Sequence, residues 1–150
     1  VTGLTHDEKG YPVMSVEAQK QMMDRLKNKI LDNKDDIIMT EGHNLDDAEI
    51  VIISYGISAR TSMAAMHQAR AQGIKAGFLR LITVWPFAEE QIKVLAKRVK
   101  GFITVEINLG QIHLEVMRAA GGKTPCHLVG HHGGTIINPE QVISKIKEAF

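Results

Sequence analysis

"AEIVIISYGISARTSMAAMHQARAQGIKAGFLRLITVW", residues 48–85, decides the fold class of this 150-residue chain. It opens with an unbroken apolar run at 48–56 that is rich in β-branched residues, which is typical of a strand buried on both faces. A helical stretch with an apolar face follows and ends at Gly73. A second strand pattern covers 75–85, where Pro86 breaks it. A strand, a helix and a strand of these lengths predict a parallel pair joined by a right-handed crossover.

The same alternation continues on both sides of this stretch. Further strands are predicted at 36–42, 102–107 and 125–130, and further helices at 15–33, 88–101, 110–122 and 138–150. The strands at 36–42 and 48–56 are too close in sequence for a crossover helix between them, so we expect the first strand to run antiparallel. The pattern therefore predicts an α/β fold, a three-layer α/β/α sandwich around a mixed five-stranded sheet.

Composition narrows the classes of function. Hydrophobic residues make up 44% and charged residues 23%, and 18 Lys and Arg against 17 Asp and Glu leave a net charge of +1. Near-neutrality argues against nucleic-acid and membrane-surface partners, which normally need a basic patch. A single cysteine cannot form an internal disulfide, which favours a cytoplasmic location. Because the chain begins with Val1 and not Met, we expect a processed chain or a part of a larger protein.

The segment "CHLVGHHGGTIINPEQV" (126–142) combines three histidines, a cysteine and two adjacent glycines. Its spacing does not match the ligand spacing of zinc sites, and neighbouring residues of a strand point to opposite faces. We therefore expect no metal here, a core position for Cys126, and a turn into the last helix, which Asn138 caps and Pro139 begins.

The segment "SYGISART" (54–61) joins a strand to a helix through a glycine. Ser54, Gly56 and Ser58 could form an anion-binding turn, because free amides at a helix N-terminus point toward such a ligand. Ser58 could equally be an ordinary helix cap. The complete glycine-rich phosphate motifs are absent from the sequence, so both readings stay open.

Two other turns carry candidate interface residues. "TVWPFAEEQ" (83–91) holds Trp85, Pro86 and Phe87, which either close the core or anchor an interface. "VEINLGQ" (105–111) places polar residues at the carboxyl end of a strand, where open α/β sheets bind ligands, although helix capping would explain them as well.

Four blocks, in this order along the chain, resemble the C-terminal part of the alpha chain of 2-oxoacid:ferredoxin oxidoreductases. They are "VTGLTHDEKGYP" (1–12), "SYGISAR" (54–60), "LRLITVWPF" (79–87) and "VEINLGQIHLEV" (105–116). The similarity is strongest to the 2-oxoglutarate and 2-ketoisovalerate types. It implies a transketolase C-terminal-like fold with one antiparallel strand. It also implies that residues 1–15 lead in from a missing N-terminal domain and that 16–150 form a single domain.

The resemblance implies a role in an enzyme that converts a 2-oxoacid, coenzyme A and oxidised ferredoxin to acyl-CoA, CO₂ and reduced ferredoxin. The parent complex would use thiamine diphosphate, Mg²⁺, iron–sulfur clusters and coenzyme A, whereas this chain alone would bind no cofactor and supply no catalytic residue. One cysteine cannot hold a four-cysteine cluster. The implied role is structural, toward the missing domain, a beta subunit, an iron–sulfur subunit and, through the complex, ferredoxin; a homodimer is a further option.

The resemblance also implies interface residues, and one other class of function stays open beside it. The candidates that it implies are Glu106, Asn108, Gly110 and Gln111 at an interface, and Thr5, His6, Asp7 and Glu8 toward the missing domain, with a solvated loop as the alternative for the last four. Trp85, Pro86 and Phe87 are interface candidates from their residue types alone. The competing class is a stand-alone small-molecule or anion-binding regulatory α/β module.

Overall fold

The computed structural model describes residues 3–150, so Val1 and Thr2, with which the expected lead-in begins, lie outside the described residues. The chain divides into two compact units, residues 1–37 and 38–150, called here the helical unit and the sheet unit. The sequence led us to expect a boundary after residue 15. The first long helix belongs to the same compact unit as the residues that precede it, and the single domain expected at 16–150 stays a prediction.

The helical unit contains a hydrogen-bonded turn within the segment that the sequence indicated as a loop or lead-in. The Asp7 carboxylate accepts hydrogen bonds from the backbone N–H of Lys9 and of Tyr11, both at 2.9 Å. Two helices follow, α1 (Val16–Leu31) and the short α2 (Lys34–Ile37). Ser15 caps α1, since its Oγ accepts from the backbone N–H of Ala18 at 3.1 Å.

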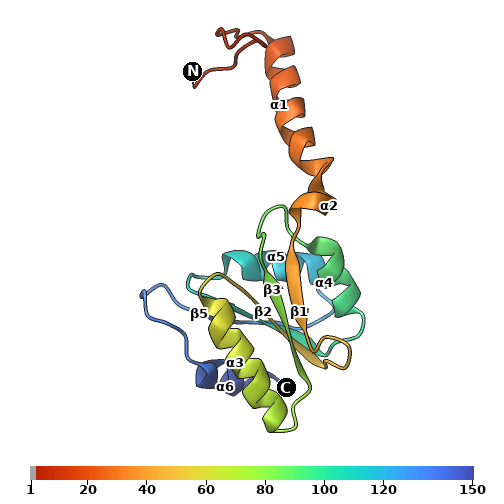
Figure 1. The fold of residues 1–150 in the computed structure, drawn as a ribbon, viewed down its shortest axis with the longest axis vertical. Coiled ribbons are helices and arrows are strands. Elements are labelled where there is room, and N and C mark those ends of the chain that lie inside the picture. The colour runs from red at the N-terminus through yellow and green to blue at the C-terminus, as the bar shows by residue number, and fades with distance from the viewer. Residues whose placement is uncertain (1–2) are drawn as a thin grey trace. The chain divides into compact units, whose positions relative to one another are not determined.

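A five-stranded mixed sheet forms the centre of the sheet unit (Figure 1). Its strands are β1 (Thr40–His43), β2 (Ile50–Tyr55), β3 (Ala76–Leu81), β4 (Gly101–Glu106) and β5 (Cys126–Gly130), arranged in the order β1-β3-β2-β4-β5. β1 pairs antiparallel with β3 and the other pairs are parallel, which confirms the predicted antiparallel first strand. The strand expected at 36–42 begins only at Thr40, because α2 extends to Ile37.

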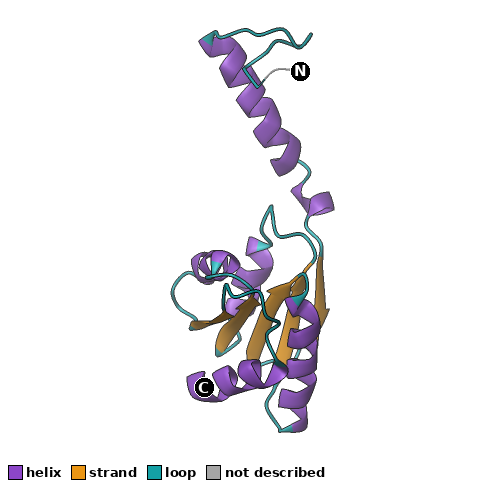
Figure 2. Cartoon of the chain, turned by 90° about the vertical axis from the view of Figure 1, so that its left-hand side faces the viewer, coloured by secondary structure: helices purple, strands orange, loops and turns teal. Residues whose placement is uncertain are grey.

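Helices cover both faces of the sheet, which confirms the three-layer prediction (Figures 1 and 2). One face carries α3 (Ser58–Ala71) and α6 (Pro139–Ala149), and the other carries α4 (Glu89–Ala96) and α5 (Gln111–Ala120). Each face has its own apolar core: Phe78 and Ile52 are central to the first, and Phe102 and Leu79 to the second. All four side chains are fully buried.

The direction of strand addition reverses beside β2. From β2 the chain passes through α3 to β3 on one side, and β4 lies on the other side. Because α3 follows β2 on one face and α5 follows β4 on the opposite face, the carboxyl ends of β2 and β4 meet between two diverging connections. This is the topological switch point, where open α/β sheets place their ligands. Tyr55 and Glu106 end these two strands.

Candidate functional site

Glu106 lies at the switch point and is completely buried. Its Oε1 accepts a hydrogen bond from the backbone N–H of His113 at 2.9 Å, and its Oε2 accepts from the backbone N–H of Ile112 at 3.1 Å. These amides belong to the first turn of α5, which has no partner for them inside the helix. The carboxylate therefore occupies the position that a bound anion takes at a helix N-terminus.

Tyr55 links this carboxylate to the neighbouring strand. Its hydroxyl donates to Glu106 Oε2 at 3.3 Å and accepts from Asn108 Nδ2 at 2.8 Å. Burial, and next the negative charge of Glu106, raise the pKa of the Tyr55 phenol. The phenol consequently stays a hydrogen-bond donor at neutral pH and holds the ends of β2 and β4 together.

Asn108 and Gly110 build the turn between β4 and α5. Asn108 Oδ1 accepts from the backbone N–H of Gly110 at 2.8 Å and of Gln111 at 3.0 Å. Gly110 has φ 103°, a left-handed conformation that glycine adopts without strain. A Cβ at Gly130, on β5, would lie 2.7 Å from the Asn108 carbonyl oxygen, so the turn also requires glycine on the adjacent strand.

His113 is a member of this cluster that sequence reasoning did not select. Its Nδ1 lies 3.3 Å from Thr104 Oγ1. Burial lowers the pKa of the His113 imidazole, the charge of Glu106 opposes that shift, and His127 lowers it further. The one indication in the sequence was its position: His113 is a polar residue in the first turn of a helix, and that helix follows a strand that ends in the polar Glu106.

A carboxylate, a phenol and an imidazole in one cluster could in principle perform acid–base chemistry. Here both oxygens of Glu106 are bonded to backbone amides or to Tyr55, and the carboxylate is inaccessible to solvent. The arrangement caps α5 and joins two strands. Of the two explanations offered for 105–111, helix capping is the one that the hydrogen bonds support.

Exposed apolar side chains stand on the loops around this cluster. One or more follow each of β2, β3, β4 and β5 at the carboxyl edge of the sheet, and together they are called here the edge surface. They are Ile57, Ile82, Val84, Trp85, Leu109 and Ile136. Leu109 is 73% exposed and Trp85 67% exposed, whereas Pro86 is buried and Phe87 packs against the second core. Of the three residues at 85–87, Trp85 alone is exposed.

The 54–58 turn lies beside a cavity on the face covered by α3. Ser54 is fully buried and its Oγ donates to the Val105 carbonyl at 2.8 Å. Ser58 is the first residue of α3 and is also buried, with Ile57 at the cap position and no side-chain capping bond there. The cavity measures about 720 Å³, and its lining residues are Glu41, Gly56, Ile57, Ala59, Arg60, Met63, Phe78 and Arg80.

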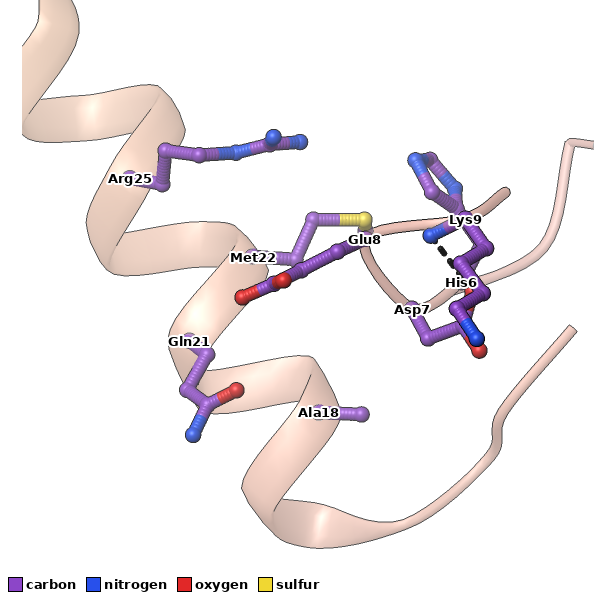
Figure 3. A pocket seen from close by; sticks show the side chains of 8 residues that line it. All are labelled: His6, Asp7, Glu8, Lys9, Ala18, Gln21, Met22 and Arg25. Atoms are coloured by element: carbon purple, nitrogen blue, oxygen red, sulfur yellow. Dashed lines mark hydrogen bonds between the residues drawn. The ribbon is translucent and has the colours of Figure 1, made fainter. Parts of the chain in front are cut away.

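A second cavity, of about 430 Å³, lies within the helical unit (Figure 3). His6, Asp7, Glu8 and Lys9 of the turn line one side, and Ala18, Gln21, Met22 and Arg25 of α1 line the other. The side chains of Glu8 and Arg25 both extend into the space between the turn and the helix. Thr5 contacts Gln19 of α1 through its hydroxyl. The four N-terminal interface candidates thus lie together around a turn that packs on its own helix.

Within residues 3–150, no group of three or more His, Cys, Asp or Glu side chains is placed to hold a metal ion. Cys126 is partly buried, its Sγ donates to the Thr124 carbonyl at 3.4 Å, and burial raises the pKa of its thiol to about 11. The segment 131–138 is a turn into α6, in which the backbone N–H of Asn138 donates to Gln141 Oε1 at 2.8 Å. None of the helices described combines the length and the apolar character that crossing a membrane requires.

Residues 48–142 match the family model "Pyruvate:ferredoxin oxidoreductase core domain II". The 2-oxoglutarate synthase subunit KorA of Methanothermobacter marburgensis is 41% identical over 147 residues, which are 97% of this chain and 39% of that protein. The ketoisovalerate oxidoreductase subunit VorB of Methanothermobacter thermautotrophicus is 40% identical over 82% of this chain and 35% of its own length. The chain therefore spans about two fifths of the curated relatives that it matches.

Two solved structures share the fold. The 2-oxoglutarate:ferredoxin oxidoreductase from Magnetococcus marinus, solved with 2-oxoglutarate, coenzyme A and succinyl-CoA bound, matches with a TM-score of 0.78 and 24% identity over 98% of this chain and 26% of that chain. A split-gene transketolase, described as an inactive beta4 tetramer, matches with a TM-score of 0.62 and 18% identity over 73% of this chain and 41% of its own. These likenesses confirm the expected transketolase C-terminal-like fold.

Proposed function

Because the chain belongs to the 2-oxoacid:ferredoxin oxidoreductase subunits of the 2-oxoglutarate and ketoisovalerate type, we propose that it is an assembly domain of such an enzyme. The whole enzyme would convert a 2-oxoacid, coenzyme A and oxidised ferredoxin to acyl-CoA, CO₂ and reduced ferredoxin, in the cytoplasm. The substrate class follows the relatives, which are named for 2-oxoglutarate and ketoisovalerate. This chain would contribute shape and contacts and no catalytic group.

The hydrogen bonds of the Glu106 carboxylate to its own chain are the observation that supports this proposal. At the switch point, where a ligand would be expected, the chain places its own carboxylate and uses it to cap α5. Tyr55 and Asn108 complete their hydrogen bonds within the same cluster. A site whose polar groups are satisfied internally supports a structural role for these residues.

The edge surface supports assembly with other subunits. A soluble monomer rarely gathers large exposed apolar side chains on successive loops, and such patches usually mark interfaces. Trp85 is an exposed aromatic of the kind that dominates binding energy when buried by a partner. We propose the beta subunit, the iron–sulfur subunit, the remainder of the alpha chain or a second copy as the surfaces that cover it. Gly110 and Gln111 would shape the central turn of this contact, and Thr5–Glu8 would face the remainder of the alpha chain.

The cofactors of the parent enzyme are assigned to its other parts. An iron–sulfur cluster of the usual type needs four thiolates, and this sequence has one cysteine, so its donor set does not fit a cluster. We propose that thiamine diphosphate, Mg²⁺ and coenzyme A are also bound by other segments of the enzyme. In this proposal ferredoxin reaches the chain only through the complex.

The proposal is tested by Leu109→Asp in the intact oxidoreductase, with Val94→Asp as the matched control. Both side chains are exposed, at 73% and 59%, but Val94 lies on α4, outside the edge surface. Leu109→Asp should reduce the fraction of assembled complex in sedimentation velocity, because a carboxylate would be buried without a partner. 2-Oxoacid-dependent dye reduction per mole of assembled complex should stay unchanged. Full assembly with lost activity would instead assign chemistry to this domain.

The cavity beside the 54–58 turn favours one other function, an anion-binding regulatory module. Gly56 lies at its rim, next to the first turn of α3, and two guanidinium groups, of Arg60 and Arg80, line it. A thermal-shift series with inorganic phosphate, nucleotides and 2-oxoacids tests this function. Saturation at 100 times Kd stabilises a protein by about 2.7 kcal/mol, which is readily measured. The absence of a shift with every anion would exclude the module.

A further inference from the structure

The helix α1 carries an apolar stripe that the described part of the helical unit leaves exposed. Val16, Met23 and the partly buried Ile30 recur every seven residues. Of the two positions between them, Gln19 is polar and Leu26 is apolar. Val16 is 80%, Leu26 48% and Met23 42% exposed, and α1 has no buried residue at all. A helix of 16 residues is marginally stable alone in water, so burial of this stripe by a partner would stabilise it.

The N-terminal turn packs mainly on a different side of α1. Ala18, Gln21, Met22 and Arg25 are the helix residues that face it across the cavity in Figure 3. None of these four is a seam residue of the stripe. The segment 3–5 and the N-terminal end of the stripe line a third cavity, of about 600 Å³, and Val16 and Met23 remain exposed there. The turn at 6–9 therefore contacts a different face of the helix from the stripe, whereas the segment 3–5 lies beside Val16 and Met23 at the N-terminal end of the stripe.

The charges that flank the stripe are all positive. Lys20 and Lys27 border it on one side and Lys29 on the other, at the positions that carry interhelical ion pairs in coiled coils. The acidic residues of the helix are Glu17 and Asp24. Each directly follows a seam residue in the sequence and so does not occupy a flanking position. Lys20 pairs with Asp24 of its own helix at 2.7 Å, on the surface.

A second copy of α1 is a poor partner on these grounds. In an antiparallel pair Lys20 would face Lys27 of the other copy, and in either orientation the flanks would offer no carboxylate to a lysine. Like charges across an interface disfavour the pairing, whereas opposite charges select it. The chemistry that complements this stripe is an apolar seam bordered by carboxylates.

We propose that α1 docks through Val16, Met23, Leu26 and Ile30 onto an amphipathic helix of another chain whose apolar seam is flanked by glutamate or aspartate. The surface is distinct from the edge surface and lies in the other compact unit. The inference therefore stands or falls independently of the assembly role of the sheet unit.

Two synthetic helical peptides test the proposal against the full 150-residue chain. Both have isoleucine and leucine at the seam positions, and they differ in having glutamate or lysine on both flanks. Fluorescence anisotropy should show that the acidic peptide binds at least about tenfold more tightly than the basic one, since several flanking ion pairs differ between them. Raising the salt concentration from about 50 to about 500 mM should reduce that preference.

Three variants make the result specific. Leu26→Gln keeps a good helix former and should weaken binding of the acidic peptide at least about fivefold. Met117→Gln is the matched control, because Met117 is 45% exposed on α5 of the other unit, and it should leave binding unchanged. The double variant Lys27→Glu with Lys29→Glu should reverse the preference toward the basic peptide. Circular dichroism confirms that each variant is folded.

Several outcomes would overturn the proposal. Equal binding of the two peptides, or binding of neither, would remove the charge argument. Sedimentation showing a dimer of the chain that Leu26→Gln dissociates would assign the stripe to a second copy instead. Acidic-peptide binding that survives Leu26→Gln would place the contact elsewhere on the chain.

Discussion

Replacing Ser62 by alanine should stabilise the sheet unit. Ser62 lies on the buried face of α3, is fully buried, and its Oγ has no hydrogen-bond partner among the described residues. An unpaired buried hydroxyl costs about 1–3 kcal/mol of folding free energy. Alanine also has a better helix propensity than serine, by about 0.5 kcal/mol. Removing the oxygen also loses its van der Waals attraction to its neighbours, at about 0.1–0.2 kcal/mol per atom pair, which reduces the gain by a few tenths of a kcal/mol. The expected gain is therefore about 1–3 kcal/mol.

Ser54→Ala is the control, since the same atom is removed from an equally buried serine. The Oγ of Ser54 donates to the Val105 carbonyl at 2.8 Å, so this variant should lose about 1 kcal/mol. Urea unfolding followed by circular dichroism measures both changes. With an unchanged m-value of about 1–3 kcal/mol/M, the two midpoints should move in opposite directions by several tenths of a molar or more. A destabilised Ser62→Ala variant would refute the assignment of an unpaired hydroxyl.

Three other substitutions or labels test particular contacts. Gly130→Ala should destabilise the unit by about 1–3 kcal/mol, because its Cβ would lie 2.7 Å from the Asn108 carbonyl oxygen, while Gly133→Ala, with its nearest neighbour at 3.9 Å, should be neutral in the same urea assay. Glu89 has a pKa lowered from 4.5 to about 2 by its hydrogen bonds to basic side chains. The ionised Glu89 therefore stabilises the folded state above pH 4.5, and this stabilisation is lost as the pH falls toward 2. Wild type and Glu89→Gln should differ in thermal midpoint at about pH 6 and have similar midpoints near pH 2. An equal difference in midpoint at both pH values would contradict this. Cys126, with its thiol pKa raised to about 11, should react with a thiol reagent at about pH 7 far more slowly than the urea-unfolded chain, and equal rates would show that the thiol is accessible.

The local part of the fold could be predicted from the sequence. The apolar run ending at Gly56 and the helix ending before Gly73 are short-range patterns, and the structure has a strand and a helix there. The antiparallel first strand followed from the few residues between it and the next strand, because a crossover helix needs more chain. The 2-oxoacid:ferredoxin oxidoreductase resemblance is confirmed by the family model and the relatives.

The candidate site could be predicted only in part. Residue types at the end of β4 pointed to Glu106 and Asn108, but the bond between Tyr55 and Glu106 joins positions 51 residues apart and depends on strand order. The strand expected to begin at residue 36 was shortened by α2, whose acidic first turn suits a helix N-terminus. The interface roles of Thr5–Glu8, Trp85 and their companions stay predictions, because a surface is defined by a partner as much as by its own residues.

Glu106 can be regarded as a tethered ligand. A chain that carries a carboxylate into its own helix N-terminus fixes that anion at an effective concentration far above any free acid, so exchange with solution anions is suppressed. Truncation to alanine would leave two amides and a phenol around a carboxylate-sized space, a receptor that formate or acetate could fill. At this switch point, a single side chain therefore separates a filled helix N-terminus from a site for a small carboxylic acid.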